Sequence, residues 1–236
     1  MEPNFLDKLT GVSFSFINVF PFSFAAYFVI SKKKKIELPD IFLFCFWVST
    51  AISGFFIFVM FLSYHFLGVP LEKTYFFILA TWIFFGASIF FIFLFLLSKI
   101  SIKPLIKIPS ALLFLCLIIL NLFFYFKGAK VGVRMNNPWL YSPFEKTGVY
   151  FLIGTIFVFF LTSLLIIKEE FQKGKITWQN LSLLYNYFAL FLYGIVSFIT
   201  TFYFFPRSII LEISYFLIPY LVYLSRKEEL KYEKKS

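Results

Sequence analysis

The strongest constraint on this sequence is a series of long apolar runs separated by short charged stretches. Residues 41–66 and 75–97 contain no acidic residue, lysine or arginine, and a helix of about 20 apolar residues crosses a ~30 Å hydrocarbon core. The whole chain is 61% hydrophobic and 14% charged, whereas a soluble domain is about 45–50% apolar and about 25% charged. A chain this apolar could not cover a water-facing surface, so we expect an all-α polytopic integral membrane protein.

The apolar runs predict about seven transmembrane helices in one bundle that forms a single domain over residues 1–236. The predicted spans are 12–30, 41–66, 75–97, 111–126, 148–167, 181–205 and 209–224, followed by a basic cytoplasmic tail at 225–236. The seventh span has 16 residues, as few as the fourth. We expect it either to be re-entrant or to lie where the bilayer thins.

The distribution of basic residues predicts the orientation. The side that holds the run Lys32–Lys35 collects 15 lysines and arginines, and the other side collects 7. Short cytoplasmic loops carry the excess of basic residues. We therefore expect a plasma-membrane or inner-membrane protein with its N-terminus outside and its C-terminus in the cytoplasm.

Ionisable groups inside a span are costly and tend to be functional. Glu212 lies inside the seventh span, and with this orientation it shares the outer face with Arg207 and His65. Arg134 and Trp139 lie in the outer loop and complete a candidate ligand-binding site. Two simpler interpretations remain open: Glu212 pairs with Arg207 or water near the interface, and His65 and Trp139 belong to the aromatic belt that marks that level.

Polar side chains recur along the sixth span at a spacing of three to four residues. They form a candidate polar path, whose members are Asn186, Tyr193, Ser197 and Thr201. The same stripe is equally suited to a packing seam, because helices in lipid associate through hydrogen bonds and small residues. The glycines inside the spans would allow such close approach, and they are Gly54, Gly86, Gly154 and Gly194.

Composition excludes several classes of function. The single histidine and the two distant cysteines, Cys45 and Cys116, cannot supply a bis-histidine haem site or a thiol redox centre. No glycine-rich phosphate loop is present, and no Ser/His or Asp/Asp pair of the kind that a membrane protease needs is found within the spans. We therefore expect no enzyme, no metal site and no cofactor. The 40 phenylalanines are interpreted as lipid-facing filler, with a ring-lined pocket as the alternative.

The net charge of +10 indicates anionic headgroups on the cytoplasmic side as the partner, rather than nucleic acid. A protein partner would bind through the cytoplasmic tail or loops. Span number and orientation resemble the seven-helix sensory regions that precede some bacterial signalling domains, although no residue motif carries this likeness. The first hypothesis is thus a sensor or receptor-like module with an outer binding site. The alternatives are a transporter subunit for an apolar or lipid-like substrate, and an assembly subunit of a membrane complex.

Overall fold

The computed structural model describes residues 5–99, 103–128, 178–202 and 214–233, and the structural statements below concern these residues. They contain helices and no strand. The elements are α1 (Phe5–Ile30), α2 (Leu38–His65), η1 (Leu71–Thr74), α3 (Tyr75–Lys99), α4 (Pro104–Gly128), α6 (Trp178–Phe202), η2 (Ser214–Phe216) and α8 (Leu217–Glu233). The all-helical expectation is confirmed for this part of the chain.

Two stretches are long and apolar enough to cross a membrane, Leu38–His65 and Leu79–Lys99. Shorter apolar stretches lie in α1, α4 and α6. Helices therefore cover the predicted spans at 12–30, 75–97 and 111–126, all of 41–66 but its last residue, and most of 181–205. The span predicted at 148–167 lies outside the described residues.

Helix boundaries differ from the predicted spans where charged residues begin. α4 starts at Pro104 rather than at residue 111, because the missing N–H of proline costs nothing in a first helical turn. α8 continues to Glu233 through most of the segment that we set apart as a tail. Ion pairs three residues apart, Arg226–Glu229 and Glu228–Lys231, accompany this extension.

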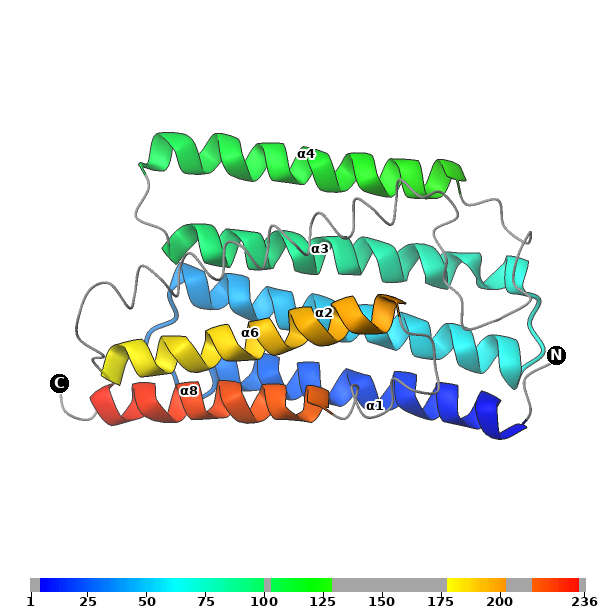
Figure 1. Ribbon diagram of the computed structural model, residues 1–236, viewed down its shortest axis with the longest axis horizontal. Helices are drawn as coiled ribbons and strands as arrows, with labels where there is room; N and C mark the ends of the chain where they lie inside the picture. The colour runs from blue at the N-terminus through cyan, green and yellow to red at the C-terminus, as the bar shows by residue number, and fades with distance from the viewer. Residues whose placement is uncertain (1–4, 100–102, 129–177, 203–213, 234–236) are drawn as a thin grey trace.

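Consecutive helices run up and down, and α4 lies at the edge of the bundle beside α3 (Figure 1). α8 lies against both α1 and α6. It runs parallel to α1 and antiparallel to α6 (Figure 1). The ends of α1, α3 and α8 and the starts of α2, α4 and α6 therefore lie at one end of the bundle. We call this end the tetralysine end, after Lys32–Lys35 between α1 and α2.

The interior is filled by aromatic rings from four elements. Phe22 of α1 stacks on Trp47 of α2 and meets Tyr215 of η2 edge to face, with ring centroids 6.0 and 5.1 Å apart. Tyr193 of α6 meets Phe22, Trp47 and Phe46 edge to face. We call these five residues the aromatic cluster. All are buried, so the bundle has a packed core at this level.

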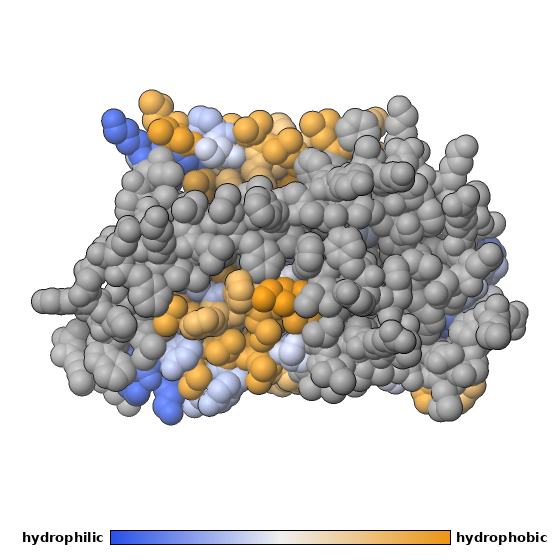
Figure 2. Space-filling view, viewed as in Figure 1, coloured by the Kyte–Doolittle hydropathy of each residue, from blue (hydrophilic) through white to orange (hydrophobic). Residues whose placement is uncertain are grey.

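Much of the outer surface is apolar. Figure 2 shows hydrophobic residues along α4 and over the region of α6 and α8. Leu105, Leu113 and Phe123 of α4 each expose more than half of their surface. Contiguous apolar surface of this kind is uncommon on soluble monomers.

Candidate functional site

The predicted outer site is represented in the described structure by His65 alone. This residue is half-buried at the last turn of α2. Its ring stacks on Phe61, with centroids 5.9 Å apart, and meets Tyr64 edge to face. The other predicted members, Glu212, Arg207, Arg134 and Trp139, lie outside the described residues. The outer site therefore stays a prediction.

The predicted polar path on α6 divides into two environments. Tyr193 belongs to the aromatic cluster, whereas Asn186 donates to Ser225 of α8 over 2.8 Å. The backbone at Ser197 and Thr201 is helical, and their side chains lie outside the described part. The two described members of the stripe thus contact different groups, at levels about 10 Å apart along the helix.

A site that the sequence analysis missed lies at the tetralysine end. It is formed by side chains from α2, α6, α8 and the α1–α2 connection. We call it the polar cluster, and its residues are Ser31, Lys33, Asp40, Ser182, Asn186, Ser225, Arg226 and Glu229.

The α1–α2 connection turns one of its four lysines inward. Ser31 continues the last turn of α1, because its N–H donates to Tyr27 O over 2.9 Å. Lys32 then adopts a positive φ of 56°, a left-handed conformation that reverses the chain after a helix. Lys33 follows and is half-buried, whereas Lys34 and Lys35 are exposed.

The start of α2 positions the carboxylate that meets Lys33. Glu37 and Asp40 form a capping box, in which Glu37 N–H donates to Asp40 Oδ2 over 3.0 Å. Such a box satisfies backbone donors that have no partner within the helix. The other carboxylate oxygen, Asp40 Oδ1, lies 2.6 Å from Lys33 Nζ. One side chain therefore both caps α2 and binds the preceding connection.

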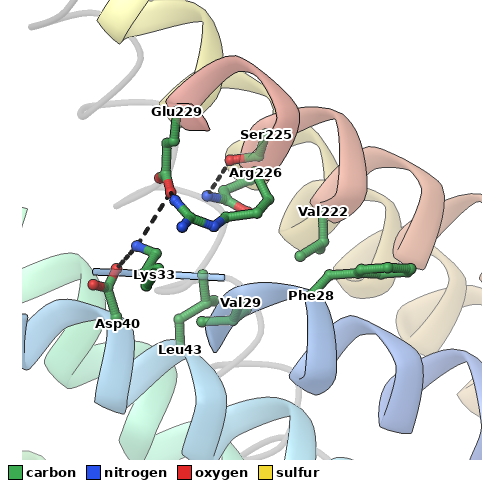
Figure 3. A pocket seen from close by; sticks show the side chains of 10 residues that line it. Phe28, Val29, Lys33, Asp40, Leu43, Val222, Ser225, Arg226 and Glu229 are labelled. Carbon is green, nitrogen blue, oxygen red and sulfur yellow. Dashed lines mark hydrogen bonds and ion pairs between the residues drawn. The ribbon is translucent and has the colours of Figure 1, made fainter. Parts of the chain in front are cut away.

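Four charges alternate across the polar cluster (Figure 3). Lys33 Nζ lies between Asp40 Oδ1 and Glu229 Oε2, which is 3.2 Å away. Arg226 Nη1 donates to the same Glu229 oxygen over 2.9 Å, and Arg226 Nε donates to Ser31 O over 2.7 Å. Arg226 is 4% exposed. Each buried charge has an opposite neighbour, which offsets the cost of removing it from water.

A chain of hydrogen bonds with one direction joins α6 to α8. Ser182 Oγ donates to Glu229 Oε1 over 3.1 Å. A hydroxyl has one proton, so in the contact of 2.9 Å between Ser182 and Ser225 the donor must be Ser225. Ser225 in turn accepts from Asn186 Nδ2. The amide orientation of Asn186 follows from this order, since an oxygen facing Ser225 would find no proton.

Asn186 Oδ1 is buried and has no hydrogen-bond partner among the described residues. A small cavity beside it is lined by Lys33, Asp40, Arg226 and Glu229, among others, and has room for about one water molecule. A water there could donate to Asn186 Oδ1. The cavity is too small for an organic ligand.

The polar cluster is suited to holding helices together rather than to chemistry. Its two cations and two carboxylates balance, and the described residues include no group of three or more histidines, cysteines and acids that could hold a metal ion. The cluster connects the α1–α2 connection, α2, α6 and α8 through direct side-chain contacts. Movement of any of these elements would break at least one of the contacts.

Comparison with protein-family models, with curated proteins and with solved structures gives no match to this chain.

Proposed function

We propose that this chain is a multi-pass membrane protein that binds and relays rather than catalyses. It is a seven-helix sensor-like module of the plasma or inner membrane, with its N-terminus outside and its C-terminus in the cytoplasm. The observation that carries the proposal is the polar cluster, in which buried Arg226 and half-buried Lys33 meet on Glu229.

The membrane placement is supported by composition and by surface. Two described helices are long and apolar enough to cross a bilayer, and α4 exposes large apolar side chains along its length. With the Lys32–Lys35 side in the cytoplasm, the polar cluster lies near the inner headgroup level. A cluster of paired charges is tolerated there more readily than at the bilayer centre.

The relay is supported by connectivity along the chain. Arg207 and Glu212, members of the predicted outer site, directly precede η2 and α8. η2 carries Tyr215 of the aromatic cluster, and α8, which follows it directly, carries Arg226 and Glu229 of the polar cluster. A ligand that displaces the outer residues would pull on α8. This would strain the contacts that α8 makes with Ser31 and Lys33. The best-supported role of a buried charge network is to favour one packing arrangement of the helices over another.

The alternative, a transporter subunit for an apolar or lipid-like substrate, is less well supported by the described helices. Tyr193 is surrounded by Phe22, Phe46 and Trp47, so the polar stripe on α6 does not continue as an open path at this level. An assembly subunit of a complex remains the third candidate. Copurification in mild detergent separates it from the others, because a single stable species without a partner contradicts it.

Distances between spin labels test the relay. Cysteines would be introduced at the exposed positions Lys103 and Lys227 after Cys45 and Cys116 are replaced by serine, and the protein would be placed in lipid nanodiscs. Glu229→Gln weakens the contacts of α8 to Lys33 and Arg226. We expect a second, discrete distance to gain population in this variant, since packed helices shift between defined arrangements.

Glu228→Gln is the matched control. It makes the same change one position earlier, and its ion pair, to Lys231, lies within α8. The control should keep the parent distance. A single unchanged distance in Glu229→Gln, with monodisperse protein, would overturn the relay and favour a rigid assembly subunit.

A further inference from the structure

Aromatic side chains that face outward line the contact between α1 and α8. On α1 they are Phe24, Tyr27 and the half-buried Phe28, in η2 the residue is Phe216, and on α8 they are Tyr220 and Tyr223. Phe28 and Tyr223 lie side by side, with ring centroids 5.4 Å apart. We call these six residues the aromatic seam.

The two helices keep a parallel register along the seam. Phe22 contacts Tyr215, Phe28 contacts Tyr223, and Ser31 accepts from Arg226. Residues at the same height on the two helices therefore stay in contact as far as the tetralysine end. Tyr27, Phe28 and Tyr223 form the last aromatic level of the seam.

Two unpaired lysines follow this level. Lys227 is one turn beyond Tyr223 on α8, and Lys32 follows the end of α1; both are exposed, and neither forms an ion pair with another described residue. The carboxylates of Asp40, Glu228 and Glu229 are already paired with other cations. These three carboxylates therefore do not neutralise Lys32 or Lys227, and Glu37, the acid nearest to Lys32 along the chain, belongs to the capping box of α2.

We propose that the aromatic seam binds one anionic phospholipid, with its phosphate between Lys32 and Lys227 and its acyl chains along the rings. One helical turn, about 6 Å, separates the tyrosine level from the lysine level, which matches the step from glycerol to headgroup. Tyrosine rings favour this boundary because they have an apolar body and a polar tip. The inference rests on the membrane placement proposed above and does not depend on the relay.

The proposed lipid site adjoins the polar cluster directly. Lys32 follows Ser31, whose carbonyl accepts from Arg226, and Lys227 follows Arg226. A phosphate held by the two lysines would hold together the two backbone segments that Arg226 connects. Bound anionic lipid should therefore stabilise the closed arrangement of α1 and α8.

Lipid-dependent melting tests the site. Delipidated protein in detergent would be titrated with phosphatidylglycerol, with phosphatidylcholine of the same chains, and with glycerophosphate. Thermal midpoints would be read by fluorescence-detected size exclusion. Phosphatidylglycerol should raise the midpoint, and the other two should not, because one lacks net charge and the other lacks chains. Equal stabilisation by phosphatidylcholine or by glycerophosphate would overturn the proposal.

The double variant Lys32→Gln/Lys227→Gln should bind phosphatidylglycerol roughly thirtyfold more weakly, because each substitution removes the contribution of one lysine to the binding free energy. Lys34→Gln/Lys103→Gln is the control, since it removes two exposed lysines from the same end of the bundle. Equal loss in both variants would indicate general surface charge and contradict the site. Protein that does not enter bilayers at all would instead contradict the membrane placement.

Discussion

At the scale of single residues, Arg226 is the most deeply buried charged residue of the described structure. It is 4% exposed and donates through two nitrogens to different acceptors, Ser31 O and Glu229 Oε2. A guanidinium presents its donors in a fixed planar fork, whereas a lysine ammonium is a compact point charge. The position therefore requires arginine by geometry as well as by charge.

The first prediction concerns this residue. Arg226→Gln should destabilise the protein by about 3 kcal/mol, because it leaves Ser31 O and part of Glu229 buried without the cation. Arg226→Lys should recover less than half of that loss. Unfolding in mixed detergent and SDS gives the free energies, and Lys34→Gln, which changes an exposed lysine at the same end of the bundle, should lie within about 0.5 kcal/mol of the parent. Full recovery by lysine would refute the two-acceptor role.

The direction of the hydrogen-bond chain gives the second prediction. Asn186→Asp replaces the donor that faces Ser225 with an acceptor and adds a third carboxylate to the polar cluster, which already holds Asp40 and Glu229. It should therefore cost more than Asn186→Ala, by about 1–2 kcal/mol, since it adds an unpaired charge to a lost hydrogen bond. The same unfolding titration measures the difference. If aspartate proved the milder substitution, the direction assigned to the chain would be wrong.

Part of the polar cluster could have been recognised in the sequence. Glu37 and Asp40 have the spacing of a capping box, and Arg226 and Glu229 have that of a helical ion pair. The contact between Lys33 and Glu229 could not, because four consecutive lysines are locally equivalent. Tertiary packing alone selects the one that turns inward.

At the scale of elements, two glycines expected to permit close helix approach occupy different environments. A Cβ added at Gly86 of α3 would lie 3.1 Å from Ile118 Cγ2 of α4, tighter than ordinary contact. At Gly54 of α2 the nearest atom, Val19 Cγ2, would lie at 3.8 Å. The expected close approach is confirmed at Gly86, where α3 and α4 meet.

The third prediction compares these glycines. Gly54→Ala should stabilise the protein by up to about 1 kcal/mol through helix propensity. Gly86→Ala should be less stable than Gly54→Ala by at least about 1 kcal/mol, because Ile118 must move. Ile118→Leu removes the methyl group on Cβ and should narrow that gap when combined with Gly86→Ala. Equal effects at the two glycines in SDS unfolding would contradict the packing described for α3 and α4.

α8 illustrates where hydropathy misplaces an element. The predicted span ended at residue 224 because charged residues begin at Arg226. The helix continues to Glu233, and Arg226 and Glu228 are buried. Hydropathy measures transfer from water to lipid, and it does not register that a charged side chain has a partner in the folded protein. The sequence was enough to predict that this segment is helical. It was not enough to predict where the helix ends or which of its faces is buried.

At the scale of the whole molecule, aromatic rings fill the interior of the helical bundle and ion pairs join its elements at the tetralysine end. Apolar composition was enough to predict helices and the absence of strands in the described residues. It was not enough to place the aromatic cluster, because Phe22, Trp47 and Tyr193 are distant in sequence and resemble their many aromatic neighbours. Which rings face inward depends on how four elements pack.

The most direct test of the account is the sidedness of the two ends of α2. Single cysteines would replace the exposed residues Lys34, before α2, and Lys73, after it, in a background without Cys45 and Cys116. A membrane-impermeant maleimide would then be applied to intact spheroplasts and to inside-out vesicles. The account predicts that position 73 is labelled only in spheroplasts and position 34 only in inside-out vesicles. Labelling of both positions from the same side would contradict a membrane-spanning α2 and, with it, the proposed architecture.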